Sequence, residues 1–260
     1  MMRFCSLGSG STGNATLVES VVGERTTRLL IDCGFTRKVL DARLARLGLL
    51  ASQLDALFIT HEHGDHVGCA LGLSQRHAIP LWTSRGTWHA LGAPRPGDGL
   101  LGLARDGQAI EIGDLLLAPY TVPHDAAEPL QLCVTDGRSR LGVLTDAGCA
   151  TPHMVAALQA CDALVLECNH DRAMLQASSY PASLKARVGG RLGHLANDSA
   201  AQVLGACKHA RLRHVVAAHL SLQNNQPALA AGALAQALGT TAEDIVVASA
   251  NDGFRWLDLH

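Results

Sequence analysis

The sequence opens with short apolar runs that are separated by turn-forming segments. Strand-like patterns cover residues 3–7, 15–20 and 27–32, with GSGSTGN and VGER between them. A helical pattern follows, because apolar residues recur at positions 39, 40, 44 and 47 and the run stops near Gly48. A buried strand is then predicted at 54–60, and it runs directly into the polar string HEHGDH.

The rest of the chain adds helices and strands in a changing ratio. Helices are predicted at 67–77 and 84–91, then a Gly/Pro-rich loop at 92–99, then strands at 108–112, 115–122, 130–135 and 140–145. The second half alternates helices at 152–160, 181–188, 199–209 and 227–238 with strands at 163–167, 214–218, 244–248 and 254–257. A β-rich half followed by a helix-richer half predicts an α/β fold with two sheets face to face and helices outside. No repeat or linker divides the sequence, so one domain spanning 1–260 is expected.

Composition adds a sizeable aliphatic core to this picture. Hydrophobic residues make up 48% of the 260 residues and aromatic residues only 3%. The N-terminus reaches glycine and serine too early for a signal peptide, and no apolar run approaches the roughly 20 residues that span a membrane. A cytoplasmic protein without a membrane segment is therefore expected. The eight cysteines form no CxxC pair, which favours reduced, buried thiols.

The charge of the chain is balanced overall but uneven along the sequence. A net charge of −2 argues against a protein that coats nucleic acid by bulk charge. The segment 172–213 nevertheless carries a single anion, Asp198, against seven cations: Arg172, Lys185, Arg187, Arg191, Lys208, Arg211 and Arg213. Two interpretations remain open, a solvated helical face or a surface that binds phosphate.

The string THEHGDH after the strand at 54–60 is the strongest chemical signal. It sets His61, His63 and His66 at i, i+2 and i+5, with Asp65 between them and Gly64 at the turn. Four such side chains at a strand end would be costly to bury without a metal ion. Imidazole combined with carboxylate favours a hydrolytic divalent metal over a thiolate-bound structural zinc.

The string HxHxDH after a strand resembles the signature of the metallo-β-lactamase superfamily. The resemblance implies a four-layer αβ/βα sandwich and two divalent metal ions, Zn or Mn, with Fe also compatible. It assigns His61 and His63 to one metal, and Asp65 and His66 to the other. Three further ligands match by position: His124 after the strand at 115–122, Asp146 as the bridging aspartate, and His219 after the strand at 214–218. Asp32 matches an aspartate that supports a ligand without binding the metal.

Longer strings resemble the YycJ (WalJ) branch of that superfamily. They are MRFCSLGSGSTGN, LLIDCG, THEHGDH, LTDAG, LECNHD, YPASLKARVGGRLGHLAN and AHLSLQNNQP. The branch implies a 5′-to-3′ exonuclease that acts on DNA, whereas the residues alone leave open the cleavage polarity and the choice between DNA and RNA. This chain departs from the pattern at Ala196, because the branch usually reads GHLSN there, and a phosphate contact from a hydroxyl at this position is thereby in doubt.

The expected reaction is hydrolysis of a phosphodiester by a hydroxide that bridges the two metals. Asp65 is a candidate to orient or deprotonate the water, and His170 and His194 are candidate general acids for the leaving oxygen. Candidate contacts to substrate phosphate are Ser221, Asn224, Asn225, Lys185 and Arg187. For the polar residues among these, helix capping or turn formation is an equally ordinary role. The GSGSTGN loop lacks the lysine of a nucleotide-binding P-loop and is interpreted as a tight loop near the metals.

Two alternatives to the nuclease remain open at this point. The first is a small-molecule hydrolase on the same fold that cleaves a cyclic phosphodiester, a lactone or a thioester. The second is a non-catalytic metal-binding protein, which the intact set of ligands disfavours. Asp146 and His219 are only 73 positions apart, too few for the domain that RNase J-like nucleases insert there. The sequence leaves the metal and the oligomeric state undetermined.

Overall fold

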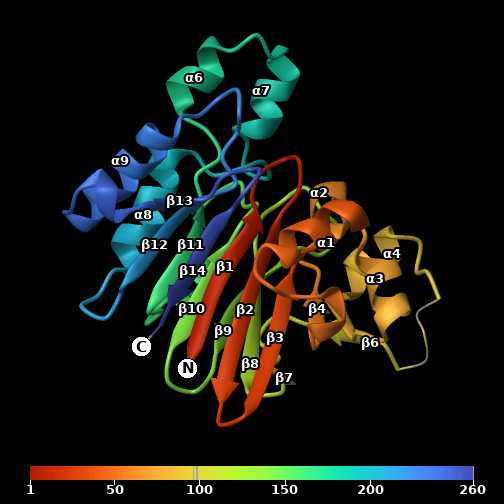
Figure 1. The fold of residues 1–260 in the computed structure, drawn as a ribbon. Coiled ribbons are helices and arrows are strands. Elements are labelled where there is room, and N and C mark those ends of the chain that lie inside the picture. The colour runs from red at the N-terminus through yellow and green to blue at the C-terminus, as the bar shows by residue number, and fades with distance from the viewer. Residues whose placement is uncertain (96, 98, 260) are drawn as a thin grey trace.

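Two mixed β-sheets pack face to face in the computed structural model, which describes residues 1–95, 97 and 99–259 (Figure 1). Within these residues each sheet has seven strands, in the orders β14-β1-β2-β3-β4-β5-β6 and β13-β12-β11-β10-β9-β8-β7. The first sheet contains β1 (Met2–Gly8), β2 (Ala15–Val22), β3 (Arg25–Ile31), β4 (Ala56–Phe58), β5 (Leu81–Ser84), β6 (Leu101–Ala104) and β14 (Phe254–Asp258). The second contains β7 (Ile110–Ile112), β8 (Leu115–Thr121), β9 (Leu130–Thr135), β10 (Arg140–Leu144), β11 (Ala163–Glu167), β12 (His214–Ala218) and β13 (Val246–Val247).

Helices cover the outer faces of both sheets (Figure 1). They are α1 (Arg37–Ala45), α2 (Gly64–Val67), α3 (Ala70–His77), α4 (Arg85–Ala90), α5 (Pro152–Ala157), α6 (Arg172–Ala177), α7 (Ala182–Val188), α8 (Asn197–Cys207) and α9 (Pro227–Leu238), with short 3₁₀ turns at Ala51–Gln53 and Ala242–Asp244. The pair α6 and α7 stands at the end of the sandwich opposite to the two chain termini. Among the described residues, none of the helices is both long and apolar enough to cross a membrane.

Three apolar clusters hold the four layers together. The central cluster lies between the sheets and includes Phe4 and Phe58 from the first sheet with Leu132 and Val165 from the second, all at most 1% exposed. A second cluster joins the first sheet to its helices, and a third joins the second sheet to α8 and α9. Burying each large apolar side chain contributes about 1.5–3 kcal/mol. The predicted α/β sandwich is thus confirmed.

Several local predictions were wrong for identifiable reasons. The helix predicted at 67–77 is split into α2 and α3, because Gly68 adopts φ 37° and a Cβ there would lie 2.4 Å from the Cys33 carbonyl oxygen. The strand predicted at 244–248 is reduced to β13, since a 3₁₀ turn occupies 242–244. The short strands β5 and β6 and the six-residue α6 were missed because they are too short for a periodic signal. Pro96 and Asp98 of the predicted loop at 92–99 lie outside the described residues.

Parallel strand pairing brings the polar strand ends to one edge of the sandwich. β3 runs parallel to β4, and β10, β11 and β12 run parallel to one another. Asp32 follows β3, Asp146 lies just beyond β10, Glu167 ends β11, and His219 follows β12. Because the carboxyl ends of parallel strands meet at the same edge, residues far apart in the sequence become neighbours there.

The start of α8 shows what the departure at position 196 does to stability. Ala196 occupies the N-cap position with φ −72° and ψ 159°, and it has no side-chain oxygen to accept a backbone N–H. Serine is a preferred N-cap, so Ala196→Ser is expected to raise the free energy of unfolding by about 0.5–1 kcal/mol, near the low end of the capping range. The gain is small because the Asp198 carboxylate already accepts the Ser199 N–H at 2.8 Å. Urea unfolding of both proteins measures it, and an unchanged or lower stability would contradict the capping argument.

Candidate metal centre

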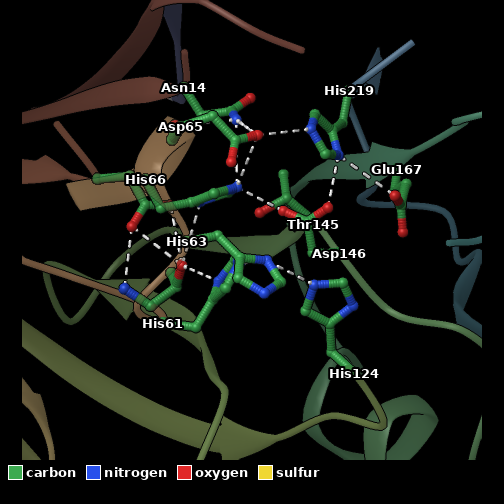
Figure 2. A network of polar contacts seen from close by, with 12 residues as sticks. Asn14, His61, His63, Asp65, His66, His124, Thr145, Asp146, Glu167 and His219 are labelled. Atoms are coloured by element: carbon green, nitrogen blue, oxygen red, sulfur yellow. Dashed lines mark hydrogen bonds and ion pairs between the residues drawn. The ribbon is translucent and has the colours of Figure 1, made fainter. Parts of the chain in front are cut away.

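Three histidine nitrogens face one another at the edge of the sandwich where the strands end (Figure 2). His61 Nε2 lies 3.1 Å from His63 Nδ1, and His124 Nε2 lies 3.3 Å from the same nitrogen. His124 Nδ1 donates to the Gly193 carbonyl oxygen at 2.9 Å, which leaves a lone pair on its Nε2. His61 Nδ1 is held by the Thr60 hydroxyl at 3.0 Å. The arrangement presents three ligand atoms to one point.

A second group gathers beside the first around Asp146. His66 Nε2 lies 2.6 Å from Asp146 Oδ2 and 3.7 Å from Asp65 Oδ2. His219 Nε2 lies 3.6 Å from the same Asp65 oxygen, and Figure 2 shows these side chains turned toward one another. A carboxylate oxygen of Asp146 also lies within 4.8 Å of a ring nitrogen of His61. The seven residues predicted as ligands therefore form two adjoining groups with Asp146 between them.

Unsatisfied polar atoms in this cluster test whether metal ions fit. Both oxygens of Asp146 and Nε2 of His219 are buried and have no hydrogen-bond partner among the described residues. Histidine nitrogens do approach Asp146 closely, but outside hydrogen-bond geometry. Buried polar atoms without partners call for an explanation. A set of imidazole and carboxylate atoms that converge without bonding one another fits divalent metal ions.

Burial and neighbouring charges set different protonation states within the cluster. Burial lowers the pKa of His61 well below its usual value, so its imidazole is neutral and can offer a lone pair. Burial opposes ionisation of Asp146, but His219 and His66 outweigh it and hold the pKa of that carboxyl well below its usual range. Burial opposes the charged form of His66, but Asp32 and Asp146 outweigh it and raise the pKa of that imidazole to about 10. A cation that binds beside Asp146 would therefore displace the proton of His66, whereas His61 already offers a lone pair.

Three residues at the strand ends adopt a left-handed backbone. Asp32, Asp146 and His219 have φ values of 61°, 54° and 54°. Residues other than glycine rarely take this conformation, although aspartate, asparagine and histidine tolerate it best. Such strain collects at functional sites, where the surrounding structure maintains it.

Residues outside the predicted ligand set hold the ligands in place. Asp32 Oδ2 lies 2.7 Å from His66 Nδ1, which is the supporting position predicted for it. Asn14 was missed by the sequence analysis: its Nδ2 donates to the backbone oxygens of Gly10 at 3.1 Å and Asp65 at 3.2 Å. Ser9 Oγ accepts the backbone N–H of His219 at 2.8 Å. The GSGSTGN loop thus holds two of the predicted metal ligands, Asp65 and His219, in place.

Glu167 is the largest omission of the sequence analysis. It is completely buried, and its Oε1 lies 2.7 Å from His194 Nδ1 and 3.3 Å from His219 Nδ1. Its Oε2 accepts backbone N–H groups from Ala147 at 2.8 Å and Leu195 at 3.1 Å. A carboxylate at the end of an apolar strand was the available signal, and it was not used. Glu167 orients two histidines at once.

His194 lies in the centre, where the prediction of a general acid requires it to be. Its Nδ1 is also 2.9 Å from Asp146 Oδ1, and its ring lies between those of His124 and His219 at centroid distances of 5.3 and 5.4 Å. Burial opposes the charged form, but Glu167 and Asp146 outweigh it and raise the pKa of His194 to about 10. The ring is 23% exposed and can hold a proton at neutral pH.

The remaining residues predicted to act on the substrate lie in different environments. His170 is buried away from the ligand groups. Asn225 exchanges hydrogen bonds with Asn197 at 2.9 and 2.8 Å and donates to the Cys168 carbonyl oxygen, which is a structural role. Ser221 Oγ accepts the backbone N–H of Asn224, whose own amide group is buried without a partner among the described residues. Asn224 is therefore the member of this turn that keeps free polar atoms.

The basic segment 172–213 does not form one surface. Lys185 and Arg187 lie on α7 at the metal end, where Arg187 pairs with Asp125 at 2.7 Å. Lys208, Arg211 and Arg213 precede β12, whereas His219 follows it. At about 3.3 Å per residue, the six steps from Arg213 to His219 span about 20 Å. Only the cations from Arg172 to Arg191 belong to the metal end.

Comparisons with known proteins agree with this geometry. A model of the metallo-beta-lactamase superfamily matches residues 8–194. The chain is 31% identical to exodeoxyribonuclease YycJ of Bacillus anthracis over 91% of this chain and 89% of that protein. It is 29% identical to exodeoxyribonuclease WalJ of Streptococcus pneumoniae over 88% and 85%. The fold is similar to the metallo-beta-lactamase fold protein YhfI from Bacillus subtilis, with a TM-score of 0.74, 16% identity and 98% of each chain covered.

Proposed function

Because the chain belongs to the metallo-β-lactamase superfamily, and within it to the YycJ/WalJ branch, we propose that it is a metal-dependent 5′-to-3′ DNA exonuclease. The observation that carries the proposal is the intact double group of ligands around Asp146, with His194 and Glu167 beside it. The proposed ligands are His61, His63 and His124 for one ion and Asp65, His66 and His219 for the other, with Asp146 shared. Zn and Mn suit this mixture of imidazole and carboxylate, and Fe is also compatible.

Divalent metals at such a site activate water as a nucleophile and neutralise charge on a reacting phosphate. The chain's own residues position the reactants and move the protons. Asp65 Oδ2 lies between the nitrogens of His66 and His219 and is partly exposed, so it can orient the attacking water and accept its proton. Glu167 holds His194 at Nδ1, which leaves the Nε2 proton for the departing sugar oxygen. Water thus attacks phosphorus and the P–O bond to the leaving nucleotide breaks.

We propose that the whole chain acts as one domain in the cytoplasm, with DNA as its partner. Pairing of β14 with β1 supports a single domain, because it brings the two ends of the chain into one sheet (Figure 1). Phe4 faces Leu257 in this pairing. Residues beyond the 8–194 match therefore complete the same fold.

The expected activity is release of mononucleotides from the 5′ end of DNA in the presence of Mn or Zn. Purified protein is incubated with oligonucleotides labelled at either end, and the products are followed with time. Asp65→Ala is expected to lower the rate by about 10²–10⁴-fold, the usual contribution of a positioned acid or base. If Asp65→Ala cleaved DNA at the same rate as the unchanged protein, the activity would come from a contaminating nuclease. Mutant-sensitive turnover of a small phosphodiester or thioester without DNA cleavage would replace the proposal by a small-molecule hydrolase.

A further inference from the structure

A hollow of about 560 Å³ lies between α6 and α7, beyond the metal ligands. His170, Arg172, Lys185 and Gly189 line it together with apolar and amide side chains. Within the part of the chain that the structure describes, its lining includes two cations and an imidazole but no carboxylate. Such a composition suits an anionic ligand.

His170 gives independent evidence that something binds there. The residue is 1% exposed, and its Nδ1 is buried without a hydrogen-bond partner among the described residues. The backbone fixes the residue, because its carbonyl oxygen accepts the Asn197 N–H at 3.0 Å and it forms a β-bridge with Ala196. Nε2 lies 3.9 Å from the point that a Cβ on Gly189 would occupy. The ring is thus held by its backbone at the wall of the hollow, with Nε2 on the side of Gly189, and its unpartnered nitrogen calls for an explanation.

The two cations are held so that donors remain free for a ligand. Arg172 Nε contacts both carboxylate oxygens of Asp198 at 2.9 and 2.7 Å, and its Nη2 donates to Ser199 Oγ. Both partners lie outside the lining of the hollow. Lys185 Nζ donates to the Gln176 carbonyl oxygen at 2.6 Å, which fixes the side chain without neutralising its charge.

The hollow and the metal centre share the same short segments of chain. His170 follows Glu167 by three residues, and the turn after α7 leads through Gly193 to His194. The Gly193 carbonyl oxygen accepts a hydrogen bond from His124 Nδ1, and the His194 N–H donates to the Val188 carbonyl oxygen at 2.9 Å. The walls of the hollow are thus connected to the metal centre through only a few residues.

We propose that this hollow binds a phosphate group of the nucleic acid strand whose scissile bond lies at the metal centre. The inference rests on the proposed nuclease function and removes His170 from the general acids, because His194 alone lies among the metal ligands. Two sources supply the phosphate, a terminal monoester or an internal diester. The first makes the enzyme selective for 5′-phosphorylated ends, and the second makes it indifferent to them.

The test compares two lysines with the same local chemistry. Lys185 and Lys208 each donate to a backbone carbonyl oxygen, at 2.6 and 2.7 Å, but Lys208 lies before β12 at the opposite end of the sheet. Binding of fluorescent 5′-phosphate and 5′-hydroxyl oligonucleotides is measured by anisotropy in a chelator, and KM is measured with Mn. Lys185→Gln is expected to weaken binding and raise KM about tenfold, the effect of one charged hydrogen bond. Lys208→Gln is expected to change neither.

The choice of substrates distinguishes a terminal from an internal phosphate. It also distinguishes failure of the phosphate site from failure of the nuclease function. A defect confined to 5′-phosphate DNA identifies the terminal monoester, and an equal defect on both DNAs identifies an internal diester. Turnover of a small aryl phosphodiester, which lacks a second phosphate, is expected to stay unchanged in Lys185→Gln. Equal binding by Lys185→Gln and Lys208→Gln would overturn the phosphate site. Wild-type protein that binds DNA in chelator but never cleaves it would overturn the nuclease function and leave the site standing.

Discussion

The Asp146→Asn protein is expected to fold normally, to lose most of its bound metal and to cleave DNA at least about a thousandfold more slowly. Asparagine is the best available replacement, because it matches the shape of aspartate and tolerates the left-handed φ of 54° at this position. It removes the charge that both ligand groups share. Metal ions contribute several kcal/mol to stabilising developing charge, and about 4 kcal/mol corresponds to about a thousandfold in rate.

Two other aspartates provide the controls for this experiment. Asp32 has the same left-handed backbone but contacts His66 from behind, so Asp32→Asn is expected to weaken metal affinity only about 10–100-fold. Asp41 pairs with Arg37 on the surface of α1, so Asp41→Asn is expected to leave metal content and DNA cleavage unchanged. Metal content by mass spectrometry and competition with a chelator rank the three variants. Full metal content in Asp146→Asn would show that this carboxylate does not bind metal.

The sequence was sufficient to predict this cluster of histidine and aspartate side chains, because polar residues follow directly after apolar strands there. The apolar run before THEHGDH predicted a buried strand, and a cluster of polar groups directly after such a strand has few roles other than binding. Asp146 and His219 were different, since an aspartate in a turn or a single histidine after a strand has ordinary explanations. They were found through the family resemblance, and the structure brings them together because β10 and β12 run parallel to β11.

Other parts of the site depend on contacts that no local pattern encodes. Glu167 is distinguished by two backbone N–H groups that come from segments 20 and 28 residues away. The basic segment resembled one surface because charge was counted along the chain, whereas the strand β12 separates Arg213 from the metal end. The hollow between α6 and α7 was invisible for a related reason, since a six-residue helix gives no periodic signal.

His194→Gln is expected to lower cleavage of DNA by about 10²–10⁴-fold while a nitrophenyl phosphodiester loses much less. A sugar oxygen is a poor leaving group and needs a proton, whereas a nitrophenolate departs without one. The contacts of His194 Nδ1 with Glu167 at 2.7 Å and Asp146 at 2.9 Å fix the ring so that the opposite nitrogen is the one available to the substrate. Steady-state kinetics on both substrates measure the difference.

Glu167→Gln tests, with the same two substrates, whether Glu167 acts by positioning His194 rather than by binding metal. The amide retains the shape of Glu167, but only one of its two polar atoms can accept a hydrogen bond. We therefore expect the rate of DNA cleavage to fall less than in His194→Gln, and the rate on the nitrophenyl substrate again to fall less than the rate on DNA. Metal content must stay at the wild-type level in His194→Gln for the result to report proton transfer. Equal losses on the two substrates, or loss of metal from His194→Gln, would instead make His194 a further ligand in the group that contains Asp146 and His219.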